Sequence, residues 1–460
     1  MLFSSLSFLF FFLPLTFLLY FTVPRGWRNA VLLAVSLIFY ALGEPIYVLL
    51  MLGTVLADFA LGLITARAKT RQTRMRWLWT AVGLHVSLLV LFKYGAWLGL
   101  PSIPLPLGIS FYTFQGLSYV IDVYRGDCLP ERSAVRFGTY VTLFPQLVAG
   151  PIVRFTEVNE ALQHRTNTLP TVASGLRTFL CGLGKKVLLA NTAGQMWDRL
   201  RSLPPSGHTV LSDTLAIVFF AFQIYYDFSG YSDMAVGLGR CFGFSFPQNF
   251  RYPYTAISVT DFWRRWHITL SAFFREYVYI PLGGNRHGRW RMVGSMLAVW
   301  VLTGLWHGDT LNFLLWGLYF FLLLLLEKLF LLRLAEHLPL FVRRATTFFA
   351  VLVGWVIFAS DGTNGLSLSW GLSYIGSMLG LGGIPLLNAE GLYELSRNLL
   401  FLAVLAVGAT PLPLRLCRRL SQKRPRLVRG ASLALCFPLL LLCTAYLVSS
   451  SYNPFLYFRF

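Results

Sequence analysis

Charged residues are scarce in this chain. Only 13% of its 460 residues are charged, whereas soluble domains carry about 25%. Acidic residues are the rarest, with 19 Asp and Glu against 39 Lys and Arg, while 56% of the residues are hydrophobic. A water-soluble fold of this size cannot hide that much apolar surface. The composition therefore excludes an ordinary soluble protein and favours one that faces lipid.

Cofactor and metal motifs are also lacking. The six cysteines are scattered without metal or redox spacing. No phosphate-binding or dinucleotide glycine pattern is present, since the glycines at 237 and 239 lack the required context. There is no Asp-x-Asp cluster to hold a metal-bound sugar nucleotide. We therefore expect no metal site, no bound cofactor and no polytopic glycosyltransferase.

The net charge of +20 raises two interpretations, a nucleic-acid binder or a membrane protein with basic loops. The basic residues lie in short gaps between apolar runs: five occur at 66–76 and seven at 415–429, with no acid in either segment. This distribution predicts membrane lipid rather than nucleic acid as the partner. It also places both segments on the cytoplasmic side and both termini outside.

Apolar runs long enough for membrane helices recur throughout the chain, because a span needs about 20 mostly apolar residues. The first run lacks a basic region before it and a small-residue cleavage site, so we expect a retained helix. The sequence predicts an all-α, polytopic integral membrane protein with ten or more transmembrane helices and one domain over 1–460, its catalytic core at about 105–320. The runs are 5–23, 29–42, 46–65, 77–97, 209–228, 292–306, 310–332, 344–359, 396–414 and 430–449.

Three weaker segments, 106–122, 138–150 and 174–192, are short or interrupted by Pro and Gly. We expect them to be re-entrant or buried, because irregular backbone at membrane depth must be surrounded by protein or a water-filled cavity.

His307 is the histidine with the most informative surroundings. It lies between two apolar runs and is flanked by Gly304 and Gly308, which bare one helical face and permit close approach of a neighbour. A neutral imidazole is a natural general base near pH 7, and Asp309 is a candidate orienting partner. An interhelical hydrogen bond is the structural alternative. His85 sits alone in an apolar helix and is predicted to be a hydrogen-bonded packing residue.

A second histidine, His267, lies in a polar and aromatic stretch. If the stretch is one helix, four of its residues share a face, and Asp261 and Arg265 form an i,i+4 pair. Binding of a polar substrate and an interfacial aromatic-basic helix explain this pattern equally well. The shared face consists of Trp263, Arg264, His267 and Ser271.

At this point the sequence resembles the membrane-bound O-acyltransferase (MBOAT) family, in its alginate O-acetylation (AlgI-like) branch, to which teichoic-acid D-alanylation (DltB-like) proteins also belong. The similarity covers nearly the whole chain, and the motifs occur in the family's order. They are LPLGISFYTFQ (105–115), DVYRG (122–126), FPQLVAGPIVR (144–154), YDFSGYSDMA (226–235), DFWRRWH (261–267), REYVYIPLGGNR (275–286), GLWHG (304–308) and NPFLYF (453–458).

The resemblance implies a fold of many helices with re-entrant and interfacial helices around a central tunnel, in a bacterial cytoplasmic (inner) membrane. It implies an O-acetyltransferase in which His307 is the membrane-embedded catalytic histidine and His267 the second polar residue. The implied donor is acetyl-CoA or another acyl thioester, such as an acyl carrier protein. The implied acceptor is an exopolysaccharide or a periplasmic or extracellular SGNH-type acyltransferase in a polysaccharide secretion system. The final polymer stays open among alginate, cellulose, another exopolysaccharide, peptidoglycan and teichoic acid.

From these residues we expect His307 to take the proton of the acceptor hydroxyl. The His267 ring and backbone N–H groups near Gly304 and Gly308 are candidate oxyanion donors. Direct transfer and a route through an acyl-enzyme both fit the sequence. An acyl-group or polymer transporter or scaffold is the alternative function. Further candidates for the substrate tunnel are Trp306, Trp263, Arg264, Asp227, Ser229, Asp309 and Asn285.

Overall fold

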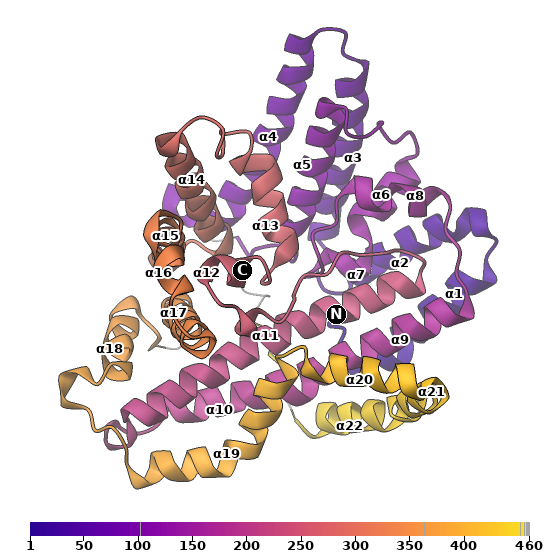
Figure 1. Ribbon diagram of the computed structural model, residues 1–460. Coiled ribbons are helices and arrows are strands. Elements are labelled where there is room, and N and C mark those ends of the chain that lie inside the picture. Colours follow the sequence, from indigo (N-terminus) through magenta and orange to yellow (C-terminus); the bar gives the residue numbers. More distant parts are fainter. Residues whose placement is uncertain (102, 363–364, 451, 455, 457–460) are drawn as a thin grey trace. The chain divides into compact units, whose positions relative to one another are not determined.

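The computed structural model describes residues 1–101, 103–362, 365–450, 452–454 and 456, and so only part of the motif at 453–458. Every regular element in this described part is a helix, which confirms the all-α prediction. The helices form two compact units. The first comprises Met1–Leu183 and Tyr231–Gln248, and the second comprises Gly184–Gly230 and Asn249–Phe460. The long helix α11 contributes to both units (Figure 1).

The first unit contains the N-terminal helices and the last turns of α11. Its elements are η1 (Phe8–Phe12), α1 (Leu13–Thr22), η2 (Arg25–Trp27), α2 (Arg28–Ala41), α3 (Tyr47–Arg67), α4 (Arg71–Tyr94), η3 (Gly95–Leu98), α5 (Ile109–Arg125), α6 (Ala134–Thr142), α7 (Phe144–Leu147), α8 (Phe155–Gln163) and α9 (Leu169–Gly184).

The second unit carries both candidate histidines. Its elements are η4 (Lys185–Ala190), α10 (Asn191–Arg201), η5 (Pro205–Gly207), α11 (Val210–Cys241), η6 (Pro253–Thr255), α12 (Val259–Trp263), α13 (Ile268–Phe274), η7 (Arg275–Tyr279), α14 (Arg289–His307), α15 (Leu311–Leu326), η8 (Glu327–Leu331), α16 (Leu332–Glu336), α17 (Leu340–Ala359), α18 (Leu368–Met378), η10 (Leu381–Gly383), α19 (Ala389–Gly408), α20 (Leu412–Lys423), α21 (Pro425–Ala434) and α22 (Cys436–Ser449).

Seven of the described helices are long and apolar enough to cross a membrane, which agrees with a multi-spanning protein. They are Tyr47–Arg67, Arg71–Leu98, Val210–Cys241, Leu311–Glu336, Leu340–Ala359, Ala389–Gly408 and Pro425–Ser449.

The expected count of ten or more spans is not confirmed. Some apolar runs end too early: α2 has 14 residues, which at 1.5 Å per residue rise about 21 Å, less than the roughly 30 Å hydrocarbon core. Two of the three weaker segments, which were not counted among these runs, are interrupted as expected: 138–150 breaks at Leu143, between α6 and α7, and α5 begins only after Gly108, whose φ is +73°. An apolar run in the sequence therefore does not by itself establish a full crossing.

A buried hydrogen bond joins two of the candidate spans in the first unit. His85 Nε2 of α4 lies 2.8 Å from Asp58 Oδ1 of α3, and both side chains are almost fully buried. The prediction that His85 is a hydrogen-bonded packing residue is thus confirmed. Gly116 of α5 lies against the same carboxylate, because a Cβ at this position would fall under 3.0 Å from Asp58 Oδ2.

Gly116→Ala is therefore expected to destabilise the protein by about 1–3 kcal/mol, the usual cost of overpacking a filled interior. The added methyl group must displace the Asp58 carboxylate and with it the bond to His85. Gly83→Ala in α4 is the matched control, since nothing lies within 4 Å of its added Cβ and alanine is the better helix former. Thermal melting in detergent measures both variants. Equal melting temperatures would contradict the proposed clash.

Candidate functional site

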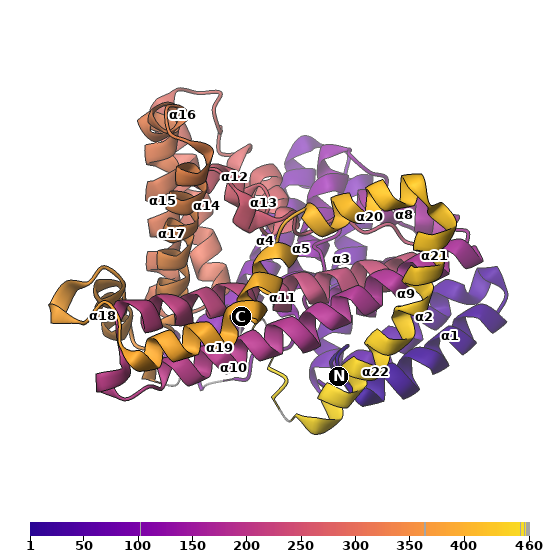
Figure 2. The same cartoon turned by 60° about the horizontal axis from the view of Figure 1, so that its bottom comes forward.

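Helices α14 and α15 of the second unit pack closely, backbone to backbone. A Cβ at Gly304 would collide with the carbonyl oxygen of Phe313, and a Cβ at Gly317 would collide with that of Trp300. The expectation that Gly304 bares a helical face for a close neighbour is confirmed. Figure 2 shows α14, α15 and α17 side by side, so the end of α14 is enclosed by its neighbours.

His307 is the last residue of α14 and is only 3% exposed. Its imidazole is surrounded by aromatic rings. The ring centroids of Trp306, Trp316 and Phe358 lie 4.8, 5.0 and 5.3 Å from its own. These rings make the surroundings of the imidazole largely apolar.

The position at a helix C-terminus has an electrostatic consequence. The carbonyl ends of a helix carry partial negative charge, which stabilises a cation placed there. The backbone N–H groups near Gly304 and Gly308 were candidate oxyanion donors. Gly304 lies inside the helix, and the N–H of Gly308 donates to the Gly304 carbonyl at 3.4 Å. Both groups are therefore less suited to this role than the sequence suggested.

The expectation of one continuous helix through His267 is wrong. Helix α12 ends at Trp263 and α13 begins at Ile268, with His267 between them at φ +45° and ψ +54°. This left-handed conformation is costly for any residue with a Cβ and interrupts the shared helical face. The predicted pair is nevertheless present, since Arg265 Nε donates to Asp261 Oδ1 at 2.8 Å.

His267 is 1% exposed, and burial lowers the pKa of its imidazole to about 3, so the ring is neutral at physiological pH. Its ring centroid lies 4.7 Å from that of Phe228 in α11 and 6.1 Å from that of Trp306 in α14. The two candidate histidines, far apart in sequence, therefore both pack against Trp306. We call Phe228, His267, Trp306, His307, Trp316 and Phe358 the histidine–aromatic cluster.

A buried carboxylate fixes the segment that leads to His267. Glu327 Oε1 accepts the N–H of Val259 at 2.6 Å, and Oε2 accepts the N–H and the hydroxyl of Thr260 at 2.8 and 2.7 Å. These bonds tie the first turn of α12 to the end of α15. The sequence motif includes α12 but gave no signal for its partner Glu327.

The other predicted tunnel residues have different surroundings. Trp263 packs against Trp316 with ring centroids 5.5 Å apart, and Ser229 is buried next to Phe228 in α11. Arg264 is exposed and Asp309 is half-buried beyond the end of α14. Asn285 is exposed, and its Oδ1 accepts from Tyr279 and Lys328 at 2.8 and 2.7 Å, outside the histidine–aromatic cluster.

Asp227, the remaining tunnel candidate, forms a buried ion pair. Its Oδ1 lies 2.8 Å from Lys186 Nζ, and the side chains are 2% and 3% exposed. Asp227 Oδ2 also accepts the N–H of Leu456 at 2.9 Å. This environment assigns it a structural partner that the sequence analysis missed.

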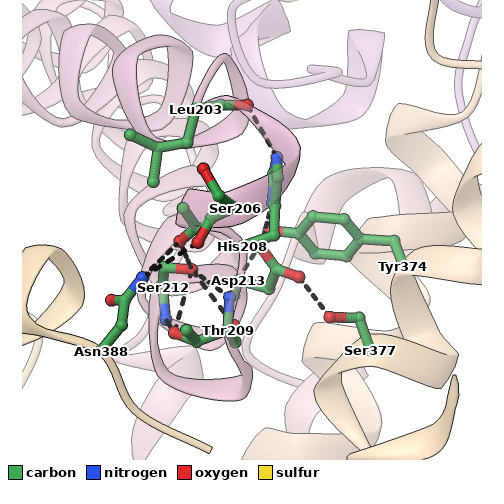
Figure 3. Close-up of polar contacts among 10 residues, drawn as sticks. Leu203, Ser206, His208, Thr209, Ser212, Asp213, Tyr374, Ser377 and Asn388 are labelled. Carbon is green, nitrogen blue, oxygen red and sulfur yellow. Dashed lines mark hydrogen bonds and ion pairs between the residues drawn. The ribbon is translucent and has the colours of Figure 1, made fainter. Parts of the chain in front are cut away.

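One further histidine–carboxylate cluster lies at the start of α11 (Figure 3). His208 Nδ1 lies 2.7 Å from Asp213 Oδ1, while its Nε2 lies 3.0 Å from the carbonyl of Leu203. Asp213 also accepts from the hydroxyl of Ser377 in α18. Both ring nitrogens face acceptors, so neither is placed to take a proton from Ser377. The cluster ties the loop before α11 to α18 and is not a nucleophilic triad.

Within the described ranges, no three His, Cys, Asp or Glu side chains are grouped so as to hold a metal ion.

The comparison with protein families matches residues 131–369 to the model described as "MBOAT, membrane-bound O-acyltransferase family". This segment includes both histidines and more than half of the chain. The chain belongs to the membrane-bound O-acyltransferase family. It is thus a multi-pass membrane acyltransferase, as the sequence motifs predicted.

Similar curated proteins carry several substrate names. The chain is 35% identical to the "probable alginate O-acetylase AlgI" of Pseudomonas putida over the whole of both chains. It is 30% identical to the "peptidoglycan O-acetyltransferase" of Helicobacter pylori, over 89% of this chain and 86% of that protein. It is 30% identical to the "teichoic acid D-alanyltransferase" of Streptococcus thermophilus, over 46% and 54% respectively.

Proposed function

We propose that this acyltransferase moves an acetyl group from a cytoplasmic acyl thioester to a hydroxyl of an extracellular polysaccharide, with His307 as the general base. The relatives named for alginate O-acetylation, which align along the whole chain, favour acetyl and a polysaccharide. The acceptor hydroxyl belongs either to the polysaccharide itself or to an SGNH-type partner that passes the acetyl group on. An inner-membrane location, and acetyl-CoA or an acyl carrier protein as donor, belong to the same proposal.

The observation that carries the proposal is the enclosure of His307. A buried imidazole at a helix C-terminus, walled by Trp306, Trp316 and Phe358, combines a base with a dry surrounding. Such proton transfer typically contributes about 10² to 10⁴-fold to a rate. A transporter or scaffold has no need for a base placed in this way.

In the proposed reaction, the acceptor oxygen attacks the thioester carbonyl while its proton passes to His307 Nδ1 or Nε2. The C–S bond then breaks, and the imidazolium returns the proton to the leaving thiolate. No net proton is produced. The carbonyl oxygen carries negative charge on the way and needs a hydrogen-bond donor.

The indole N–H of Trp316 is our candidate for that donor. Trp316 is 1% exposed, its ring lies 5.0 Å from that of His307, and among the described residues its Nε1 has no hydrogen-bond partner. A buried indole N–H normally has an acceptor. An acceptor that arrives with the substrate would satisfy it.

Trp316→Phe keeps an aromatic ring and removes the N–H. Loss of one such donor is expected to lower kcat about 10² to 10³-fold with a smaller change in KM. Trp290→Phe in the same helix as His307 is the control, since Trp290 is 89% exposed. A kcat for Trp316→Phe equal to that of the control would remove Trp316 from the mechanism.

The proposal is tested with the purified full-length protein and radiolabelled acetyl-CoA. Appearance of free CoA thiol together with acetylated acceptor is expected. Polysaccharide acetyl content in cells that lack and then regain the protein gives the second readout. If the protein restores polysaccharide acetylation in cells but the purified protein does not cleave acetyl-CoA, the transporter or scaffold is favoured.

A further inference from the structure

Asn249 bonds to the turn at His267 through both its backbone and its side chain. Its backbone carbonyl accepts the N–H of Ile268 at 3.0 Å, directly after His267. Its side-chain Oδ1 lies 3.1 Å from His267 Nδ1 and accepts the N–H and the hydroxyl of Thr269 at 3.3 and 3.0 Å. Asn249 is 2% exposed. It therefore holds the strained turn in which His267 has positive φ.

These bonds determine which atom of the Asn249 amide faces the ring. A backbone N–H only donates, so the amide atom that meets the N–H of Thr269 must be the oxygen. The same oxygen faces His267 Nδ1. Since an amide oxygen only accepts, Nδ1 must carry a proton.

The protonation of Nδ1 determines the role of the other ring nitrogen. The imidazole is neutral, so it has one N–H, and Nε2 then carries a lone pair. His267 in this form accepts a hydrogen bond at Nε2 and does not donate one. The expected use of the His267 ring as an oxyanion donor does not fit this tautomer.

We propose that Asn249 is a positioning residue that fixes His267 as the Nδ1–H tautomer, so that Nε2 accepts a hydrogen bond from the acceptor hydroxyl. The catalytic part of this inference rests on the proposed function. The two histidines then differ in role: His307 takes the proton, while His267 orients the hydroxyl by accepting from it before transfer.

The side chains around His267 in the described part of the chain include both uncharged rings and charged groups. Phe228 and Trp306 contact the ring and carry no charge. His307 lies across Trp306, and the neighbouring Arg265 is paired with Asp261. The exposed Arg264 is the other basic side chain in this turn. A carboxylate in place of the Asn249 amide would put a negative charge directly against the ring, since Asn249 Oδ1 lies 3.1 Å from His267 Nδ1.

Two substitutions separate the tautomer from mere packing. Asn249→Ala removes the acceptor and should lower kcat about 10 to 100-fold, as loss of a partner that orients a functional histidine does in metal sites. Asn249→Asp keeps an acceptor for Nδ1–H and should restore most of the activity. The carboxylate stabilises the imidazolium and raises the pKa of His267, so the acid limb of kcat should move to higher pH. Gln248→Ala, an exposed amide next in sequence, is the control.

The tautomer of His267 is measured by NMR of the full-length protein labelled with ¹⁵N-histidine. The signals of His267 are assigned as those that disappear from the spectrum of the His267→Gln variant. We expect a protonated Nδ1 in the wild type and in Asn249→Asp, and a mixture or Nε2–H in Asn249→Ala. An Nε2–H signal in the wild type would overturn the inference whatever the activity. Failure of the wild type to transfer acetyl would instead count against the proposed function.

The amide nitrogen of Asn249 gives the competing explanation. Nδ2 is buried and has no hydrogen-bond partner among the described residues. If Asn249→Asp keeps Nδ1–H but loses as much activity as Asn249→Ala, the site needs this donor and the positioning role is wrong. An Asn249→Ala variant with a changed tautomer and the kcat of Gln248→Ala would overturn the catalytic part.

Discussion

Replacing His307 with alanine is expected to abolish acyl transfer, lowering kcat by about 10² to 10⁴-fold or more. The physical reason is the loss of the only proposed base, which lies at the end of α14 among aromatic rings. The measurement is release of CoA thiol from acetyl-CoA together with label on the acceptor. His307→Gln keeps hydrogen-bonding groups and similar volume, and it should be equally inactive.

The control for this substitution is His337→Ala, since His337 is exposed and lies just after α16. Both variants should be recovered from the membrane in the amount of the wild type and should melt near its temperature. A His307→Ala protein that retains a tenth of the wild-type kcat would contradict the assignment of the base. A variant that fails to insert would be replaced by His307→Gln.

Most of the fold class was accessible from the sequence because apolar runs report directly on helices that face lipid. The runs around α3, α15 and α17 are long and uniform, and each appears as a helix of 16 to 21 residues. The sequence did not predict the local structure where the backbone leaves the regular helical repeat. The turn at His267 depends on bonds to Asn249, 18 residues earlier, which helical spacing does not contain.

The candidate site was predicted unevenly for the same reason. His307 is recognisable from local features, as a polar residue between glycines in an apolar context. Asn249 and Glu327 act through contacts with residues 18 and 67–68 positions away, so nothing in their own neighbourhood marks them. Trp316 is one aromatic residue among many in apolar helices, and its place beside His307 becomes visible only in the structure.

Asp227 was a candidate functional residue because it is charged, but in the structure its carboxylate is part of a buried ion pair. Charged groups at membrane depth suggest function by default, which made Asp227 a tunnel candidate. In the structure Lys186 Nζ, 2.8 Å from Asp227 Oδ1, is also bonded to Asn191 Oδ1 at 2.9 Å and to the carbonyl of Pro454. The pair thus joins η4, α11 and the segment after α22.

Lys186→Met is accordingly expected to destabilise the protein by about 3–5 kcal/mol, because it leaves the Asp227 carboxylate buried without its cation. Asp227→Asn should cost a similar amount by leaving the ammonium unpaired. The double variant removes both charges, while the amide oxygen introduced by Asp227→Asn can still accept the N–H of Leu456, so it should be more stable than either single variant. SDS-induced unfolding in mixed micelles measures all three. The activity of the double variant decides the role of Asp227: recovery above both single variants supports a structural pair, whereas a stable but inactive double variant would mean that the carboxylate takes part in the chemistry.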